Sequence, residues 1–339
     1  MSTKSSQIAV SLQQFPAARP RNGFRWLTQH QHQLVLPGLF LVALLIFAVA
    51  APDFFSADNQ LNVSRQSVYL MLVSLAQLIV LVGGGIDLSV GTIMALSSVV
   101  AAMTMNGIYQ EGAGSAAWAM AVGTAVALLV GAVVGLINGI GTALLRIPSF
   151  MMTLGISSVV FGVALFLSAG VPVYGVPQEF GQMFGYGYLL GIPTPVLIVV
   201  LVILMVYILL EWTRFGRHMY AIGGNPRAAT LSGVRTERVT ILAFVLSGTL
   251  SALSGVLLTA RLGTGESSIG TTFPLESIAA CVIAGAALTG GRGRTFAIVA
   301  GTFLIVVVQN GMNLMQIGSY AQTMAVGALL IFAMIFAKK

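Results

Sequence analysis

Long apolar stretches recur along the whole chain and restrict what it can fold into. Most of them reach the length of about 17–25 residues that crosses a bilayer as an α-helix. Lipid offers no hydrogen bonds to the backbone, so a spanning segment must satisfy its own N–H and C=O groups. The sequence therefore predicts membrane helices, in ten stretches: 34–51, 67–82, 88–105, 116–145, 149–168, 192–210, 239–260, 275–288, 296–309 and 320–336.

The composition agrees with a membrane location. Of 339 residues, 57% are hydrophobic and 7% are charged, whereas a soluble domain has about 25% charged residues. A net charge of +7 raises the question of nucleic acid, but the basic residues cluster beside apolar runs and form no continuous face, which argues against it. We expect an all-α polytopic membrane protein of about ten transmembrane helices, with a basic N-terminal arm at 1–33 and a transmembrane domain at 34–339.

The distribution of charge predicts the topology. Ten spans place both termini on one side, and basic residues favour the cytoplasmic side of a membrane. With cytoplasmic termini, only Arg65 and Arg261 among the basic residues fall outside. The inside residues are Lys4, Arg19, Arg21, Arg25, Arg146, Arg214, Arg217, Arg227, Arg235, Arg238, Arg292, Arg294, Lys338 and Lys339.

Small residues at spacing four predict close helix contacts. Gly131, Gly135 and Gly139 follow this spacing in one stretch, and Ser247, Ser251 and Gly255 follow it in another. A second pattern, an apolar run broken by a double glycine, occurs at 81–96 and at 287–305. Both turns face the same side in the predicted topology, so this pattern gives no inverted repeat.

The segment 212–240 is the longest basic, polar stretch between two apolar runs, and it contains a short predicted helix. Asn225 can cap this helix, Pro226 suits its first position, and Gly233 suits the left-handed residue that ends it. One interpretation is a surface loop with two helical turns. The other is a rigid docking element on the cytoplasmic face, with Leu231 exposed until a partner binds. Its residues are Asn225, Pro226, Arg227, Ala228, Ala229, Thr230, Leu231, Ser232 and Gly233.

The sequence lacks the motifs of an enzyme. No GxxxxGK[ST] phosphate loop occurs, and the lysines are confined to the two ends. Neither a Ser/His/Asp set nor a metal-ligand cluster is evident, and His30, His32 and His218 are expected near the membrane interface. We therefore predict no catalytic or metal site and no cofactor in this chain, and an energy supply outside it.

Polar residues inside the apolar stretches are candidates for a solute path. Asp87 follows three glycines and precedes an apolar run; it either caps the next helix or faces a water-filled path through a broken helix. The other candidates for the path are Gln77, Asn138 and Asn310, and Gln309 and Asn313 lie nearby. These amides can bind a passing hydroxylated solute, or they can instead hold helices together.

The run Gly84-Gly85-Ile86-Asp87-Leu88-Ser89-Val90-Gly91 is the most distinctive motif of the chain. It is similar to the signature of the ribose-type permeases of bacterial ABC importers. The segment Ile222–Ala229 with Ser232-Gly233-Val234 resembles that family's cytoplasmic coupling segment. The segments 244–255 and 290–293 also fit, in the expected order, and the likeness runs from about residue 34 to 336.

The resemblance implies an inner-membrane permease that works as a pair, with an identical or a different second subunit. A cytoplasmic ATPase, which would bind ATP and Mg²⁺, is expected to dock on Asn225–Gly233, and a periplasmic binding protein is expected to deliver a monosaccharide or similar small solute. Two alternatives stay open: an ion-coupled secondary transporter, which needs more charge inside the membrane, and a purely structural membrane subunit.

Overall fold

The computed structural model describes residues 31–110, 112 and 114–337. The predicted arm at 1–33 lies almost entirely outside them. The elements in chain order are α2 (Gln31–Ala50), η1 (Pro52–Phe55), α3 (Ala57–Val82), α4 (Val90–Gln110), α5 (Ala116–Ala143), α6 (Ser149–Ser168), α7 (Gln178–Phe180), η2 (Gly181–Gly185), β1 (Tyr188–Leu189), β2 (Ile192–Pro193), α8 (Thr194–Tyr207), η3 (Ile208–Trp212), α9 (Arg214–Gly224), α10 (Pro226–Leu231), α11 (Thr236–Leu262), α12 (Phe273–Ile283), α13 (Thr295–Leu314) and α14 (Ser319–Ala337).

Each of the ten predicted stretches contains one apolar helix, which confirms the all-α polytopic fold. In the described residues, 7 helices are long and apolar enough to cross a membrane. Three shorter apolar helices lie at Leu36–Ala50, Phe273–Ile283 and Ser319–Ile331. The predicted run at 275–288 is the clearest departure, because its helix, α12, ends at Ile283 and the chain then turns.

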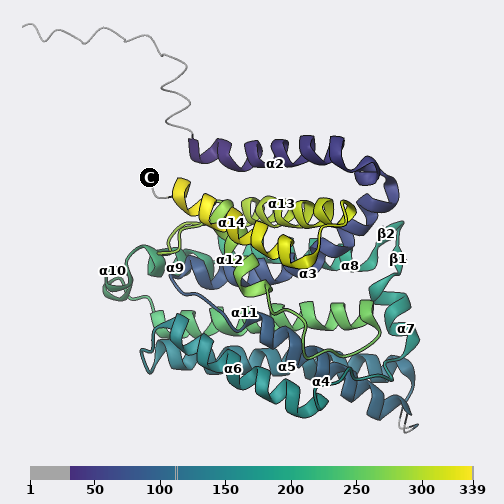
Figure 1. Ribbon diagram of the computed structural model, residues 1–339. Helices are drawn as coiled ribbons and strands as arrows, with labels where there is room; N and C mark the ends of the chain where they lie inside the picture. Colours follow the sequence, from purple (N-terminus) through teal and green to yellow (C-terminus); the bar gives the residue numbers. More distant parts are fainter. Residues whose placement is uncertain (1–30, 111, 113, 338–339) are drawn as a thin grey trace, which may run out of the picture.

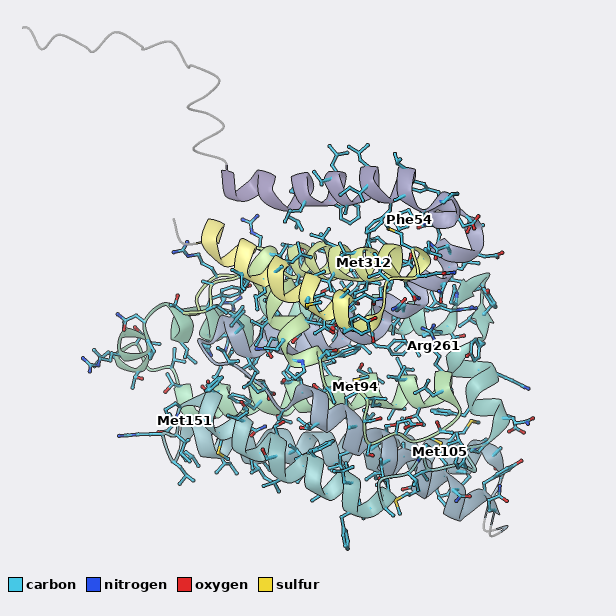
Figure 2. The ribbon with its side chains drawn as sticks, viewed as in Figure 1. Phe54, Met94, Met105, Met151, Arg261 and Met312 are labelled. Carbon is cyan, nitrogen blue, oxygen red and sulfur yellow. The ribbon has the colours of Figure 1, made fainter. Side chains whose placement is uncertain are left out.

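Helix α3 lies at the centre of the bundle. In its most apolar 18-residue window, 89% of the residues are buried, against 17% for α6 and 28% for α5. Its side chains pack against α8, α11 and α12 in the largest cluster of buried apolar residues. Helices α5, α6 and α8 instead expose many large apolar side chains, as helices next to lipid do. The bundle therefore has a packed axis and an apolar perimeter (Figure 2).

The contact between α5 and α11 confirms the predicted role of small residues. Gly131 packs on Gly248 and Ala252, and Gly135 packs on the backbone of Phe244. A Cβ atom at either glycine would overlap these neighbours, so the two helices approach at backbone distance. The predicted small-residue spacing thus marks a real helix–helix contact.

Two helix pairs with a non-helical break are arranged with opposite polarity. Helix α3 runs antiparallel to α11, since Ser254 bonds the carbonyl of Tyr69 whereas Phe244 lies near Val80 and Gly85. Each is followed by a break, 83–89 and 263–272, and then by α4 or α12. The breaks meet where Gly91 packs on Gly270. The pair α3–α4 and the pair α11–α12 are therefore inverted copies of one arrangement. The two double-glycine turns, which share a sequence pattern, are not related in this way.

The bundle has two distinct ends (Figure 1). We call the end with α9 and α10 the α10 end, and the end with η2 and the antiparallel pair β1–β2 the hairpin end. Helix α2 begins and α14 ends at the α10 end. The two described ends of the chain therefore lie on the same side, as an even number of crossings requires.

Replacing Gly135 with leucine should destabilise the bundle, because the side chain would separate α5 from α11. Overpacking of this kind costs about 1–3 kcal/mol. Thermal unfolding of the purified protein measures the loss. Gly162→Leu is the matched control, since a Cβ atom at Gly162 on α6 meets nothing within 4 Å. Equal melting temperatures for the two variants would contradict this packing.

Candidate functional site

Helix α9 is an element that sequence reasoning missed. The sequence predicts a single helix in the polar segment 212–240, the short one that begins after Asn225. The structure has a helix at Arg214–Gly224, with Thr213 capping it through the backbone N–H of Gly216 at 3.4 Å. Met219 and Ile222 are buried against the bundle. Apolar residues at 215, 219 and 222, after a capping threonine, were the signal that could have revealed it.

Helix α10 has the caps that the sequence predicts. The Asn225 side-chain oxygen accepts from the backbone N–H of Ala228 at 3.0 Å. At the other end Gly233 has φ +83, and the N–H of Val234 reaches the Ala229 carbonyl at 3.1 Å. Ala229 is buried, whereas Leu231 is 90% exposed. A short rigid helix therefore presents one large apolar side chain to its surroundings.

Three glycine turns meet where α9 ends. They are Gly83–Gly85 at the end of α3, Gly223–Gly224 at the end of α9, and Gly290–Gly291 between α12 and α13. The Gly291 N–H donates to the Val82 carbonyl at 2.9 Å, and a Cβ atom at Gly290 would lie 2.7 Å from the Cα of Gly84. The turns fit only as bare backbone, so the predicted motifs at 84–91, 222–229 and 290–293 form one contact, the glycine junction.

A tyrosine adds a polar contact to the glycine junction. The Tyr220 hydroxyl, on α9, donates to the Gly293 carbonyl at 2.8 Å. Burial raises the pKa of this hydroxyl above its ordinary value, and the negative charge of Glu211 raises it further. The group is therefore protonated at physiological pH and remains a donor. Helix α9 is thereby fixed to the segment that leads into α13.

Asp87 lies in the break between α3 and α4 and is fully buried. One carboxylate oxygen accepts from the N–H and the hydroxyl of Ser89, at 3.0 and 2.6 Å. The other accepts from the Ser247 hydroxyl of α11 at 2.8 Å. The carboxylate thus orders the turn before α4 and binds it to α11. These contacts favour the interpretation in which Asp87 caps the helix over the one in which it faces an open path.

Helix α6 supports the same break. The backbone N–H of Ile86 donates to the Ser149 hydroxyl, and that of Leu88 donates to the Thr153 hydroxyl, both at 3.0 Å. These are groups that a continuous helix would have satisfied itself. Two side chains of α6 therefore replace the missing helical hydrogen bonds.

The other candidate path residues are also buried, in three separate places. Asn138 donates to the Ser89 hydroxyl at 2.8 Å and so joins the Asp87 cluster. The Gln77 amide is buried in α3 without a hydrogen-bond partner among the described residues. Asn310 exchanges two hydrogen bonds of 3.0 Å with Asn59, which ties α13 to the start of α3. Only Asp87 and Asn138 are brought together.

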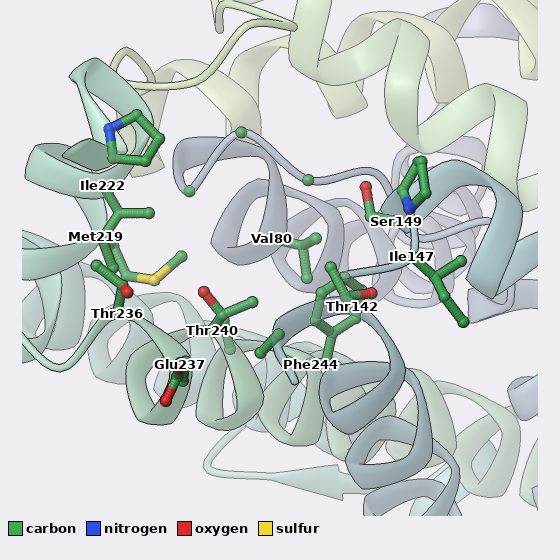
Figure 3. A pocket seen from close by; sticks show the side chains of 17 residues that line it. Val80, Thr142, Ile147, Ser149, Met219, Ile222, Thr236, Glu237, Thr240 and Phe244 are labelled. Atoms are coloured by element: carbon green, nitrogen blue, oxygen red, sulfur yellow. The ribbon is translucent and has the colours of Figure 1, made fainter. Parts of the chain in front are cut away.

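A cavity of about 300 Å³ opens beside the glycine junction (Figure 3). It lies between the Gly83–Gly85 turn, the α5–α6 connection, α9 and the start of α11. Its wall combines Met219, Ile222 and Phe244 with Ser149, and Glu237 is its one ionisable lining residue among those described. The cavity lies at the α10 end, and Pro226, the first residue of α10, is one of its lining residues.

This architecture defines a class: a polytopic helical membrane protein with interrupted helix pairs inside and a short, capped helix exposed at one end. The chain belongs to the family whose model is described as the permease component of branched-chain amino acid transport systems, which matches residues 59–337.

The chain is also similar to sugar permeases. It is 38% identical to the ribose import permease of Bacillus subtilis (strain 168) over 89% of this chain and 91% of that protein. It is 34% identical to the D-allose transport system permease of Escherichia coli (strain K12), over 87% and 88%. The L-arabinose permease of the same organism is 34% identical, over 88% of each. No solved structure matches. The predicted resemblance to ribose-type permeases is therefore confirmed.

Replacing Asp87 with asparagine should lower membrane abundance and solute transport in parallel. The amide puts an N–H₂ group opposite a donor that the carboxylate now accepts, and a buried unsatisfied group costs about 1–3 kcal/mol. Immunoblots of membranes and uptake of the solute measure the two effects.

Asp58→Asn is the control, since Asp58 lies in the first turn of α3 and is exposed. Transport that falls while abundance holds would instead favour the interpretation in which Asp87 faces the path.

Proposed function

We propose that this chain is the membrane-spanning subunit of an ATP-driven importer for a monosaccharide or a similar small hydroxylated solute. The observation that carries the proposal is α10, a capped helix with an exposed leucine, which directly follows α9 and its end in the glycine junction. A partner that displaces α10 would pass the displacement through α9 to the turns of the junction. The similarity to the ribose, allose and arabinose permeases supports the solute class.

The α10 end is assigned to the cytoplasm. Arginines gather there on α9, α10 and the turns around them: Arg214, Arg217, Arg227, Arg235, Arg238, Arg292 and Arg294. Basic residues favour the cytoplasmic side, and both termini would lie on it. The hairpin end then faces the periplasm of a bacterial inner membrane. The basic residues that lie at the hairpin end are Arg65 and Arg261, which contact the rings of Tyr188 and Tyr69.

The proposed partners follow from this orientation. A cytoplasmic ATPase docks on α10 and binds the ATP and Mg²⁺. A second permease subunit, identical or different, completes the membrane assembly, and a periplasmic binding protein delivers the solute to the hairpin end. Uptake that persists when the ATPase cannot hydrolyse ATP would contradict this proposal and favour an ion-coupled transporter.

The exposed leucine of α10 gives a direct test of ATPase docking. Leu231→Asp should abolish or strongly weaken capture of the ATPase, because burying an unpaired carboxylate in the partner's pocket costs several kcal/mol. Folding should be unaffected, since Leu231 is 90% exposed. The measurement is pull-down of the ATPase together with solute-stimulated ATP hydrolysis.

The matched control is Leu190→Asp, which makes the same change at a leucine that is 91% exposed at the hairpin end. It should leave ATPase capture intact. Gly233→Val adds a variant that acts through the backbone: no atom lies near its new Cβ, and the harm comes from the φ of +83. Full capture and stimulation by Leu231→Asp would remove α10 from the mechanism.

Reporter fusions test the orientation independently. A reporter joined after Gly185, in η2, should be periplasmic, and one joined after Gly224, at the end of α9, should be cytoplasmic. Paired phosphatase and fluorescent-protein fusions give opposite signals on the two sides and so control for expression. The same side for both fusions would contradict the assignment.

A further inference from the structure

A second cavity, of about 540 Å³, lies at the hairpin end. It is enclosed by the first turns of α3, the last turns of α11 and α13, and the first turns of α12 and α14. Figure 2 shows Arg261, one of its lining residues, at this end of the bundle. Its volume falls within the roughly 300–1,000 Å³ typical of small-molecule sites.

The cavity wall carries many polar side chains, although it is formed by helices of the membrane bundle. Glu276 is only 6% exposed, and it lines the cavity together with Thr272 and Gln309. Arg261 donates to the Asn62 side-chain oxygen at 3.3 Å and lies over the ring of Tyr69 at 5.7 Å. One acid and one base thus face a shared space.

The Tyr69 hydroxyl is the observation that points to a ligand. Tyr69 is 3% exposed and lines the cavity, and its hydroxyl has no hydrogen-bond partner among the described residues. A buried hydroxyl without a partner destabilises a fold. The hydroxyl oxygen has almost no accessible surface, so a solute hydroxyl supplies the missing hydrogen bond once the Tyr69 side chain turns into the cavity.

We propose that this cavity binds one neutral, polyhydroxylated molecule of monosaccharide size, held by Tyr69, Glu276, Gln309, Asn313 and Gln322. The inference rests on the proposed function, and it assigns the solute-binding site to the outer half of the permease. The candidate path residue Asn310 points elsewhere, because it pairs with Asn59, while its neighbours Gln309 and Asn313 line the cavity.

The chemistry of the wall favours a sugar over an ion or a branched amino acid. Arg261 and Glu276 offset each other, so the cavity carries no net charge to select an ion. Most of the other polar lining groups are amides and hydroxyls, which both donate and accept as sugar hydroxyls do. An aliphatic side chain would leave many of them unpaired, at a cost in affinity. The ring of Tyr69 adds an apolar face.

The first experiment establishes which solute the importer moves. The ATPase–permease complex is reconstituted into liposomes with its binding protein, and import of labelled D-ribose, D-allose, L-arabinose and L-leucine is measured. Import of a sugar is expected. Import of leucine alone, or of none of the four, would overturn both the proposed function and this cavity.

The second experiment tests the cavity with the sugar that is imported, using the ATPase–permease complex in nanodiscs without binding protein. Tyr69→Phe should raise the dissociation constant about 2- to 12-fold, as expected for one neutral hydrogen bond. Glu276→Gln should raise it about 10- to 150-fold, as expected for a charged one. Tyr174→Phe, at an exposed tyrosine, should change nothing.

Thermal unfolding of the same samples separates binding from structure. Tyr69→Phe removes a hydroxyl that has no hydrogen-bond partner in the described part of the chain, so the melting temperature of the variant should equal or exceed that of the wild type. A lower melting temperature with an unchanged dissociation constant would make Tyr69 structural and overturn the inference. Sugar import by the wild type, with no binding at millimolar sugar or with unchanged binding by both variants, would overturn the cavity and leave the proposed function standing.

Discussion

The break between α3 and α4 contains polar groups that other helices of the bundle must satisfy with hydrogen bonds. A non-helical segment inside a membrane protein leaves backbone groups without helical partners, and lipid supplies none. Here Ser149 and Thr153 of α6 receive the N–H groups of Ile86 and Leu88, and the Asp87 carboxylate receives the N–H of Ser89. Ser247 joins from α11. The hydrogen bonds made by the seven residues of the break, 83–89, thus hold α6 and α11 to the same segment, although these helices are distant in sequence.

The break also connects the two ends of the molecule. It begins in the glycine junction, where α9 and the α12–α13 turn pack on the end of α3, and it leads into the first turn of α4, where Gly91 packs on Gly270 of the second break. One cavity lies beside the junction, and the other lies beyond the second break. Packed backbone has little freedom to deform gradually. A displacement of α9 would therefore move the three turns of the glycine junction together.

The sequence predicted most of what depends on local pattern. Ten apolar helices, the caps of α10, the exposed Leu231 and the small-residue contact of α5 with α11 follow from periodicity, capping residues and spacing. What escaped depends on contacts distant in sequence. Helix α9 is short and basic, and its three apolar positions at 215, 219 and 222 are a weak signal until the bundle surface that they cover is known. Asn310 looked like a path residue because no pattern could show that Asn59 lies opposite it.

The inverted relation of α3–α4 to α11–α12 escaped for a similar reason. The double glycines at 83–85 and 290–291 share a pattern, but they share it because they touch each other, not because they are repeats. The equivalent break at 263–272 has a different sequence and carries no double glycine. The two pairs share a helix–break–helix path, and such a path requires no shared residue pattern.

The central position of α3 has a consequence for how the protein is made. This helix leaves the ribosome well before α11, which covers much of its surface and begins about 150 residues after Val82. At a synthesis rate of roughly 5–20 residues per second, α3 waits on the order of ten seconds or more for that partner. During this interval Ser74 and Gln77, buried in the finished bundle, face lipid, the insertion machinery or an early helix. Biogenesis, as much as transport, therefore constrains which side chains α3 can carry.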